Sequence, residues 1–347
     1  MSGKPFQSKL LPFEDEIFTR LDAGGTYRQV ADDLNRIHGL AITHNAVFSF
    51  AKSRRKRRGV RMFYEGLSSD IRSQLLKQVA AVWTHDSTAL EGNTLTLGET
   101  VKVLELGLTI SGKPLREHQE VYGHARAIDL VYGMILQPEV TQEDLFALHR
   151  AVMAPSPLDV QNPVGDWKQS YNGTTGVANG QVVFMEYADP MDVPQLMKRW
   201  LVEFNETLDQ TRRSSDAIGA YIRAHMSFVR IHPFFDGNGR VARLIANIPV
   251  LRGGHPPMIV PNERRSDYID LLWEYQYAVG KIRPDAPLMP PHPAIERFKA
   301  LLDEEWQRTL THVATARKRE AERQEGMKRK AEKERERPHS GRKKGIL

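Results

Sequence analysis

Apolar residues recur three and four positions apart along most of the chain, which is the spacing that puts them on one face of an α-helix. The pattern predicts helices over residues 71–88, 117–136, 141–153, 193–208, 216–231, 240–251 and 296–314. One stretch, residues 170–190, instead has Asn-Gly turn pairs followed by the apolar run QVVFMEY, which predicts a β-hairpin. We therefore expect a mainly α-helical domain over residues 61–310 that carries a single hairpin.

The first sixty residues show a separate pattern of three short helices. Thr26 and Thr43 are suited to cap the second and third helices, and Gly39 is suited to end the second. The residues predicted to face inward are Ile17, Phe18, Leu21, Val30, Leu34, Ile37, Val47 and Phe50. The predicted organisation is a small helical domain at 1–60, the larger domain at 61–310 and a charged tail at 311–347.

Five consecutive basic residues follow the third helix: Arg54, Arg55, Lys56, Arg57 and Arg58. A three-helix unit that ends in such a run resembles a helix-turn-helix DNA-binding domain, in which the last helix lies in the major groove and nearby cations bind phosphate. The resemblance implies that the polar positions of the third helix face the bases: Thr43, His44, Asn45 and Ser49. A small protein-interaction module with a basic linker is the alternative.

Charge is unevenly distributed along the chain, whose net charge is +6. Residues 1–60 contribute +5 and residues 317–347 contribute +7, so the middle of the chain is mildly acidic. Basic ends favour contact with a polyanion, and simple solvation of both ends is the alternative. The tail mixes charges at helical spacing without an apolar stripe, so we expect it to extend a helix and to be disordered beyond Pro338.

The composition excludes several kinds of protein. The chain has no cysteine, which rules out disulfides and thiolate metal sites. No segment approaches 18 consecutive apolar residues, and the first residues have no apolar run with a cleavage-site pattern. We expect a soluble, cytoplasmic protein that does not bind a membrane.

The densest group of chemically active residues is HPFFDGNGR, residues 232–240, which joins two amphipathic helical patterns. Free backbone N–H groups and the helix dipole favour an anion where the second helix begins. The residues at that helix N-terminus are Gly237, Asn238 and Gly239. Arg240 and Arg243 share a helical face and add positive charge there.

Other residues of the same loop suit catalysis or support. Asp236 can hold Mg²⁺, a hard ion that prefers carboxylate and phosphate oxygens. His232 can act as a general base near neutral pH. We expect Phe234 to turn into the helical core and anchor the loop, with Phe235 as the second choice. An ordinary Asp-Gly and Asn-Gly turn is the alternative for the whole stretch.

HPFFDGNGRVAR, residues 232–243, matches every specified position of H-P-F-x-x-G-N-G-R-x-x-R. On this signature the chain resembles the Fic family, over about residues 60–300. Fic proteins are α-helical, and most transfer AMP from ATP to a side-chain hydroxyl of a target protein. The resemblance implies that His232 deprotonates the hydroxyl, Asp236 binds Mg²⁺ and Arg243 grips the γ-phosphate. The residues implied to hold the other phosphates are Gly237, Asn238, Gly239 and Arg240.

The hairpin is similar to the flap of Fic domains, which pairs with the backbone of the target as an added strand. The residues implied to lie near the acceptor are Val183, Phe184 and Met185. The chain departs from the family pattern at residues 165–168, which read GDWK where many members have Gly-x-x-Arg. Lysine keeps the charge but loses the planar fork, so a flap-anchoring role for Lys168 stays open.

Residues 87–93, STALEGN, resemble the inhibitory motif [S/T]-x-x-x-E-[G/N] of many Fic proteins, on a helix that we expect at 80–93. In those proteins the glutamate pairs with the second arginine of the signature and blocks productive ATP binding. The resemblance implies that Glu91, with Ser87 before it, competes with the γ-phosphate for Arg243. A local ion pair at an ordinary helix end is the alternative.

The sequence thus favours a self-inhibited protein adenylyltransferase that uses ATP and Mg²⁺ and modifies a Tyr, Thr or Ser hydroxyl of a protein partner. The alternative is a DNA-binding regulator whose Fic domain senses nucleotide, although a sensor would not need His232. A Fic enzyme that uses another nucleotide or removes AMP is also compatible with the loop. Duplex DNA and a second copy of the chain, in a homo-oligomer, are the further partners considered.

Overall fold

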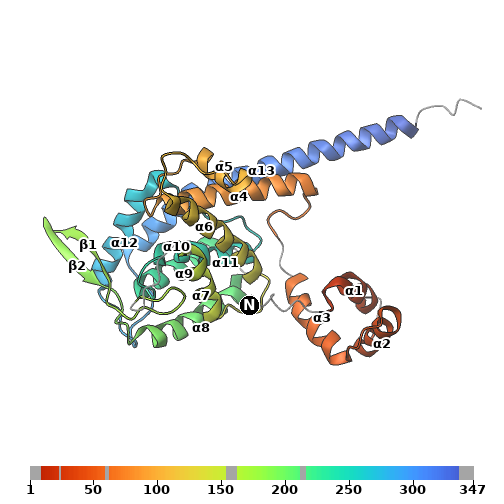
Figure 1. Cartoon of the computed structure of the whole chain (residues 1–347), viewed down its shortest axis with the longest axis horizontal. Coiled ribbons are helices and arrows are strands. Elements are labelled where there is room, and N and C mark those ends of the chain that lie inside the picture. The colour runs from red at the N-terminus through yellow and green to blue at the C-terminus, as the bar shows by residue number, and fades with distance from the viewer. Residues whose placement is uncertain (1–8, 23–24, 59–61, 154–161, 212–215, 336–347) are drawn as a thin grey trace, which may run out of the picture. The chain divides into compact units, whose positions relative to one another are not determined.

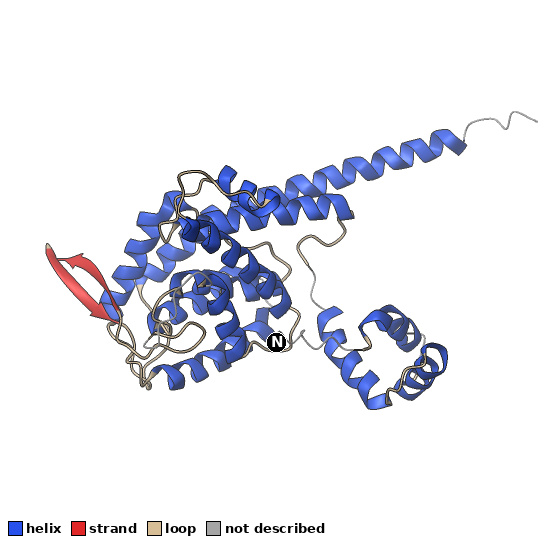
Figure 2. Cartoon of the chain, in the orientation of Figure 1, coloured by secondary structure: helices blue, strands red, loops and turns tan. Residues whose placement is uncertain are grey.

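The computed structural model describes residues 9–22, 25–58, 62–153, 162–211 and 216–335. These residues are mainly helical and carry one β-hairpin, as the periodicity predicts (Figure 2). The chain divides into two compact units, one of residues 1–61 with 136–139 and one of residues 62–135 with 140–347. Within the described ranges, no helix is long and apolar enough to cross a membrane.

The first unit contains three helices, as the sequence predicts (Figure 1). Its elements are η1 (Leu11–Phe13), α1 (Glu14–Asp22), α2 (Tyr27–His38) and α3 (His44–Arg58). Thr26 and Gln29 form a reciprocal capping box at the start of α2, and Gly39 ends that helix in the left-handed region, with φ 64°. The hydroxyl of Thr43 accepts a hydrogen bond from the backbone N–H of Ala46 at 3.2 Å.

The core of this unit confirms all but one of the residues predicted to face inward. Ile17, Val47 and their partners are buried, whereas Ile37 is 49% exposed. Ile37 lies in the last turn of α2, and the loop that follows supplies Leu40 and Ile42 to the core instead. The prediction for Ile37 was therefore wrong because helical spacing does not show where neighbouring elements stop covering a face.

The second unit holds the remaining elements. They are α4 (Ser69–Ala89), α5 (Leu97–Leu106), α6 (Leu115–Met134), α7 (Gln142–Val152), β1 (Gly173–Ala178), β2 (Gln181–Glu186), α8 (Val193–Thr211), α9 (Ala217–Ile231), α10 (Asn238–Ile245), α11 (Asn247–Arg252), η2 (Asn262–Arg264), α12 (Arg265–Val279) and α13 (Pro293–Arg335). The periodicity did not single out α5 and α12. The helix α13 runs without a break across the predicted boundary at residue 310, and the tail beyond Pro338 lies outside the described residues.

Helix α9 lies at the centre of this unit and packs against α8, α10, α11 and α13. The helix predicted over residues 240–251 is two helices, α10 and α11, that meet at Ala246. Pro249 explains the break, because it lacks an N–H and its ring clashes with the carbonyl four residues earlier. The loop between α9 and α10 thus connects two largely buried helices.

Helix α13 also fixes the start of α4. The carboxylate of Glu320 accepts hydrogen bonds from the backbone N–H and the hydroxyl of Ser68, at 2.9 Å and 2.6 Å. Arg323 pairs with Asp70 in the first turn of α4 at 2.6 Å. These contacts hold the helix whose far end carries STALEGN.

The hairpin pairs β1 and β2 antiparallel around the turn Asn179-Gly180. Both turn residues have positive φ, 51° and 73°, which is the geometry that Asn-Gly favours in a two-residue hairpin. One face packs on Trp273 of α12, since a Cβ at Gly176 would lie 1.8 Å from its indole nitrogen. The other face exposes a row of apolar side chains: Val177, Val182 and Phe184.

Candidate active site

The loop that joins α9 to α10 is anchored by a buried phenylalanine. Phe234 is 0% exposed and stacks on His149, with ring centroids 3.8 Å apart, whereas Phe235 is 43% exposed. The side chain of Asn238 accepts a hydrogen bond from the N–H of Phe234 at 2.9 Å and donates to its carbonyl at 2.7 Å. The predicted anchoring role of Phe234 is confirmed, and Asn238 acts from the helix as a clamp on the loop.

His232 ends α9 in the left-handed region, with φ 55°. Its Nδ1 lies 3.2 Å from the carbonyl oxygen of Val229, which can only accept, so Nδ1 carries the proton and Nε2 is bare. The ring stacks on Tyr187, with centroids 3.7 Å apart. Burial, together with the positive charge of Lys168, lowers the pKa of His232 to about 3. The imidazole is therefore neutral and can accept a proton at Nε2.

Bare backbone forms the start of α10. Gly237 has φ 77° and stands at the N-cap, where no side chain caps the helix. A Cβ at Gly237 would lie 2.9 Å from the sulfur of Met153, and one at Gly239 would lie 2.5 Å from Oε1 of Glu91. The backbone at the start of α10 thus lies against Met153 and Glu91 too closely for a side chain at either glycine, and a helix N-terminus of this kind favours an anion.

The two arginines of the signature contact different parts of the domain. Arg240, 8% exposed, donates to the carbonyl of Val152 and to the sulfur of Met153, both at 3.3 Å. Arg243, 3% exposed, is directed at the end of α4. Both arginines lie on one face of α10, as predicted. Their side chains nevertheless contact different residues.

Arg243 is held by the residues of STALEGN. Its Nε donates to the hydroxyl of Ser87 at 3.1 Å and its Nη2 to the carbonyl of the same residue at 2.8 Å. Nη2 also pairs with Oε1 of Glu91 at 2.7 Å. Burial alone would raise the pKa of Glu91, but the charge and hydrogen bond of Arg243 outweigh it and hold that pKa below its usual value. The structure thus brings Ser87, Glu91 and Arg243 together.

Glu91 lies in a turn rather than on a helix. Helix α4 starts at Ser69 and ends at Ala89, so the helix predicted at 80–93 starts earlier and stops two residues before the glutamate. Gly92 makes the turn with φ 99°. From α12, Arg265 donates to the carbonyl of Leu90 at 2.9 Å, a contact that the sequence did not reveal.

The lysine that replaces the family's arginine before the flap is buried. Lys168, 2% exposed, donates to Oδ1 of Asn172 at 2.6 Å. The side-chain amide of Asn172 donates to the carbonyl of Phe234 at 2.9 Å, and its backbone carbonyl accepts from the N–H of Tyr187 at 3.1 Å. Lys168 therefore supports both the loop and the base of the hairpin, and burial lowers its own pKa to about 7.

The three predicted flap residues lie on β2 but not on one face. Val183 and Met185 are half-buried, whereas Phe184 is 61% exposed on the opposite face. At the base of the flap Lys281 pairs with Glu186 at 2.7 Å and with Asp189 at 2.5 Å. The strand is thus held at the end that lies nearest to Tyr187 and His232.

The residues predicted to face DNA lie on the first unit. Thr43 precedes α3, and the other three candidates lie on the first turns of that helix. All four side chains are exposed: Thr43, His44, Asn45 and Ser49. The run Arg54, Arg55, Lys56, Arg57 and Arg58 falls within the bounds of α3, and its side chains lie outside the described residues.

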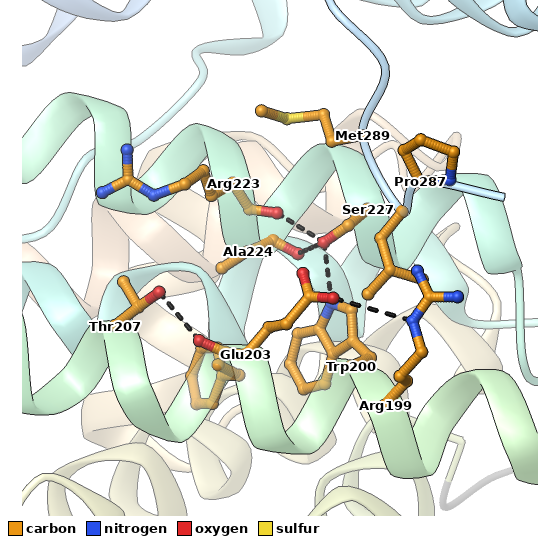
Figure 3. A pocket seen from close by; sticks show the side chains of 11 residues that line it. Arg199, Trp200, Glu203, Thr207, Arg223, Ala224, Ser227, Pro287 and Met289 are labelled. Atoms are coloured by element: carbon orange, nitrogen blue, oxygen red, sulfur yellow. Dashed lines mark hydrogen bonds and ion pairs between the residues drawn. The ribbon is translucent and has the colours of Figure 1, made fainter. Parts of the chain in front are cut away.

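Two cavities differ in their relation to the loop. One of ≈ 80 Å³ lies beside the stack of His232 and Tyr187; it is lined by Thr174, Tyr187, Met226, Val229, Arg230, Ile269, Leu272, Trp273, Tyr275 and Gln276. The other, of ≈ 280 Å³, lies between α8, α9 and residues 287–289, and Figure 3 shows Glu203 and Arg199 at its wall and the hydrogen bond from Trp200 to Ser227. No residue of HPFFDGNGR lines the second cavity.

Asp236 is the carboxylate available for a metal ion at this site. Its side chain is 67% exposed, and its Oδ1 accepts a hydrogen bond from the N–H of Gly237 at 2.6 Å. In the part of the chain that the structure describes, no group of three or more His, Asp or Glu side chains could hold a metal ion unaided. Asp236 fits Mg²⁺ only if phosphate oxygens and water supply the other ligands.

These features define a class of protein: an α-helical domain with a loop that leads into the uncapped N-terminus of a helix, a neutral histidine at the entrance of the loop, and a carboxylate paired with an arginine of that helix. Residues 139–249 match the model of the Fic/DOC family. The chain therefore carries a Fic/DOC-family domain.

Relatives with known names agree with this assignment. The chain is 33% identical over 218 residues to Protein adenylyltransferase fic-1 of Caenorhabditis briggsae, covering 61% of this chain and 39% of that protein. It is 34% identical over 191 residues to Protein adenylyltransferase Fic of Drosophila grimshawi, covering 54% of this chain and 36% of that protein. The chain thus spans less than half the length of these relatives.

Solved structures share the fold. A Fic domain containing signaling protein from Bacteroides thetaiotaomicron superposes with a TM-score of 0.62 at 26% identity, over 77% of this chain and 96% of that one. Fic-1 (residues 134–508) from C. elegans superposes with a TM-score of 0.58 at 24% identity, over 90% of this chain and 86% of that one.

Proposed function

We propose that the protein is a self-inhibited protein adenylyltransferase that transfers AMP from ATP to a hydroxyl of a target protein. The observation that carries the proposal is the 2.7 Å contact between Glu91 and Arg243 beside the uncapped N-terminus of α10. A carboxylate on the cation of an anion site is in the position of a competitor for a phosphate. The relatives are named protein adenylyltransferases, which supports the choice of reaction.

In this proposal the phosphates of ATP occupy the start of α10, with Arg240 and Arg243 beside them. The target hydroxyl gives its proton to Nε2 of His232, the nitrogen that the Val229 hydrogen bond leaves bare. The hydroxyl oxygen forms a bond to the α-phosphorus as the bond to the leaving pyrophosphate breaks. Positioning and stabilisation of charge supply most of the rate.

Asp236 would hold Mg²⁺ through its exposed carboxylate. When bound, the ion would neutralise charge that develops on the phosphate oxygens. The hydrogen bond from the N–H of Gly237 keeps the carboxylate turned toward the start of α10, where the phosphates would lie.

The target would present a Tyr, Thr or Ser hydroxyl while pairing with the hairpin as an added strand. Val183 and Met185 on one face of β2, and Phe184 on the other, would contact residues on both sides of the acceptor. A second copy of the protein is one candidate target, and the assay below detects its modification as self-labelling.

The proposal is tested with α-labelled ATP and Mg²⁺ on four full-length proteins: wild type, Glu91→Gly, Glu91→Gly with His232→Ala, and Arg243→Ala. We expect weak self-labelling of the wild type and a gain of about 5- to 150-fold for Glu91→Gly, the range of a typical coupling energy. The double variant and Arg243→Ala should stay weak, because one lacks the base and the other lacks the phosphate clamp. A wild type as active as Glu91→Gly would contradict self-inhibition.

A second function is carried by the first unit: we propose that it binds duplex DNA through α3. The exposed polar side chains on the first turns of that helix support the proposal, as do the five basic residues within its bounds. Thr43, His44, Asn45 and Ser49 would reach the bases, and the basic run would contact phosphates.

DNA binding by the full-length protein is tested by titration with duplex DNA at increasing salt. Five phosphate contacts predict a log–log slope of about −4.5. Asn45→Ala should weaken binding to a preferred sequence without changing that slope, since Asn45 would contact a base. Absence of any binding at low salt would favour a protein-interaction module.

A further inference from the structure

Arg243 has contacts on two sides, and they come from different elements. Among the described residues its guanidinium makes four hydrogen bonds, of which three run to Ser87 and Glu91 at the end of α4. The fourth runs from Nη1 to the hydroxyl of Tyr268 on α12 at 3.4 Å. The guanidinium carbon also lies 5.9 Å from the centre of the Tyr268 ring. Tyr268 is therefore the side chain outside the inhibitory element that holds this arginine.

A buried histidine is the second hydrogen-bond partner of the Tyr268 hydroxyl. His225, 0% exposed, has its Nε2 2.8 Å from the hydroxyl of Tyr268. Arg243 can only donate, so the tyrosine oxygen accepts from it. In the tautomer of His225 with a bare Nε2, the single proton of the hydroxyl goes to that nitrogen, and the buried Nδ1 has no partner among the described residues. Burial lowers the pKa of His225 to about 3, which keeps the ring neutral and able to accept that proton. The lone pairs of Tyr268 are thus turned toward the guanidinium.

We propose that Tyr268, oriented by His225, is the positioning residue that keeps Arg243 in place for the γ-phosphate of ATP when Glu91 is displaced. The inference rests on the proposed function, because it takes the γ-phosphate as the ligand of Arg243. When the turn after α4 gives up its contacts, a guanidinium without a second holder could adopt other rotamers. Ordering it again would cost binding energy that the phosphate contact would otherwise contribute.

The effect of losing Tyr268 depends on which phosphate is present. A nucleotide with a γ-phosphate uses Arg243, whereas ADP lacks the group that this arginine would grip. Removal of the tyrosine hydroxyl should therefore weaken ATP and leave ADP unchanged. A purely structural role would affect both nucleotides alike, since both bind to the start of α10.

The experiment measures the affinities of ATP and ADP for the full-length protein with Glu91→Gly, with and without Tyr268→Phe. We expect the Kd of ATP to rise about tenfold, the loss of a hydrogen bond to a charged group, and the Kd of ADP to stay the same. His225→Gln places an amide where Nε2 lies and should preserve the ATP affinity. His225→Leu removes the acceptor and should weaken ATP as Tyr268→Phe does, which gives a second route if the tyrosine variant does not fold.

Three results would overturn the proposal, and they are distinguishable. An unchanged Kd of ATP in Tyr268→Phe would show that Arg243 needs no second holder. Equal losses for ATP and ADP, with a lower unfolding temperature, would reduce Tyr268 to a packing residue. Failure of Glu91→Gly itself to bind ATP would contradict the proposed function before Tyr268 is changed.

Discussion

In the described part of the first unit the buried side chains are apolar, whereas the Fic domain buries histidines and arginines around HPFFDGNGR. The polar residues of α3 lie on the surface, where a partner can reach them without any change in the core. In the Fic domain Arg243 and His225 are enclosed, so the contacts of these two residues also pack the fold. Mutations should therefore affect binding without affecting stability in the first unit, and affect the site and the stability together in the second.

Acid should reveal this difference most strongly. Burial lowers the pKa of five histidines of the second unit: to about 3 for His124, His225 and His232, to about 4 for His149, and below its ordinary value for His255. Unfolding restores their ordinary pKa of 6.5, so below pH 6.5 the unfolded chain binds protons that the folded domain does not. Stability should fall as pH falls from 6.5 toward 4, by up to about 1.4 kcal/mol per pH unit for each histidine.

Calorimetric unfolding at pH 7, 6 and 5 measures this loss. Together these histidines would remove a typical domain stability of about 5–15 kcal/mol within a few pH units. The first unit has no buried histidine among its described residues, so its transition should move much less. An equal decrease in the unfolding temperatures of both units would contradict the expected difference in their response to acid.

Loss of the proposed base is the next largest effect. In Glu91→Gly, the further change His232→Ala should reduce AMP transfer by about 10²- to 10⁴-fold while ATP still binds. His44→Ala, on the exposed start of α3, is the matched control and should leave transfer unchanged. Label incorporation and nucleotide titration on the same samples separate the two steps, and undiminished transfer by the His232 variant would remove its assigned role.

The adjacent phenylalanines of the loop give a matched pair within the Fic domain. Phe234→Ala should cost about 3–5 kcal/mol of unfolding free energy, because its ring is fully buried against His149. Phe235→Ala should change it by no more than about 0.5 kcal/mol, since that side chain is exposed. Denaturant unfolding of both variants measures the difference, and equal costs would show that the loop is not anchored by one ring.

The smallest expected effect concerns Arg265. Its hydrogen bond to Leu90 holds the turn that carries Glu91, so Arg265→Ala should partly release inhibition. A net hydrogen bond of about 1 kcal/mol predicts a gain in self-labelling of roughly 2- to 10-fold. The same change in Glu91→Gly should have no effect. A gain there as well would mean that Arg265 acts on catalysis rather than on the turn.

The sequence predicted most helices and the signature loop because both are local. Capping at Thr26 and the Asn-Gly turn of the hairpin need only a few neighbouring residues. The missed features depend on distant parts of the chain. Pro249 divides a helix whose apolar spacing is continuous. Ile37 is exposed because the neighbouring elements of the first unit do not extend over the last turn of α2.

Part of the site was also hidden for this reason. Tyr268 and Arg265 come from α12, a helix that the periodicity did not single out, and the partners of both lie far away in sequence. Lys168 could be noticed only as a departure from a pattern, and its contact with Asn172 is a property of the folded loop. Motif spacing identifies the residues that would contact a ligand. It does not identify the residues that hold those side chains in position.

Because Glu91 is part of the same chain as Arg243, its local concentration at the arginine does not change when the protein is diluted. In the proposed enzyme, a fixed internal ligand sets a threshold that free ATP must exceed, and that threshold is the same for a scarce protein as for an abundant one. A higher expression level would then raise the total rate of AMP transfer without changing the ATP concentration that displaces Glu91. Only something that moves the turn after α4 could shift it.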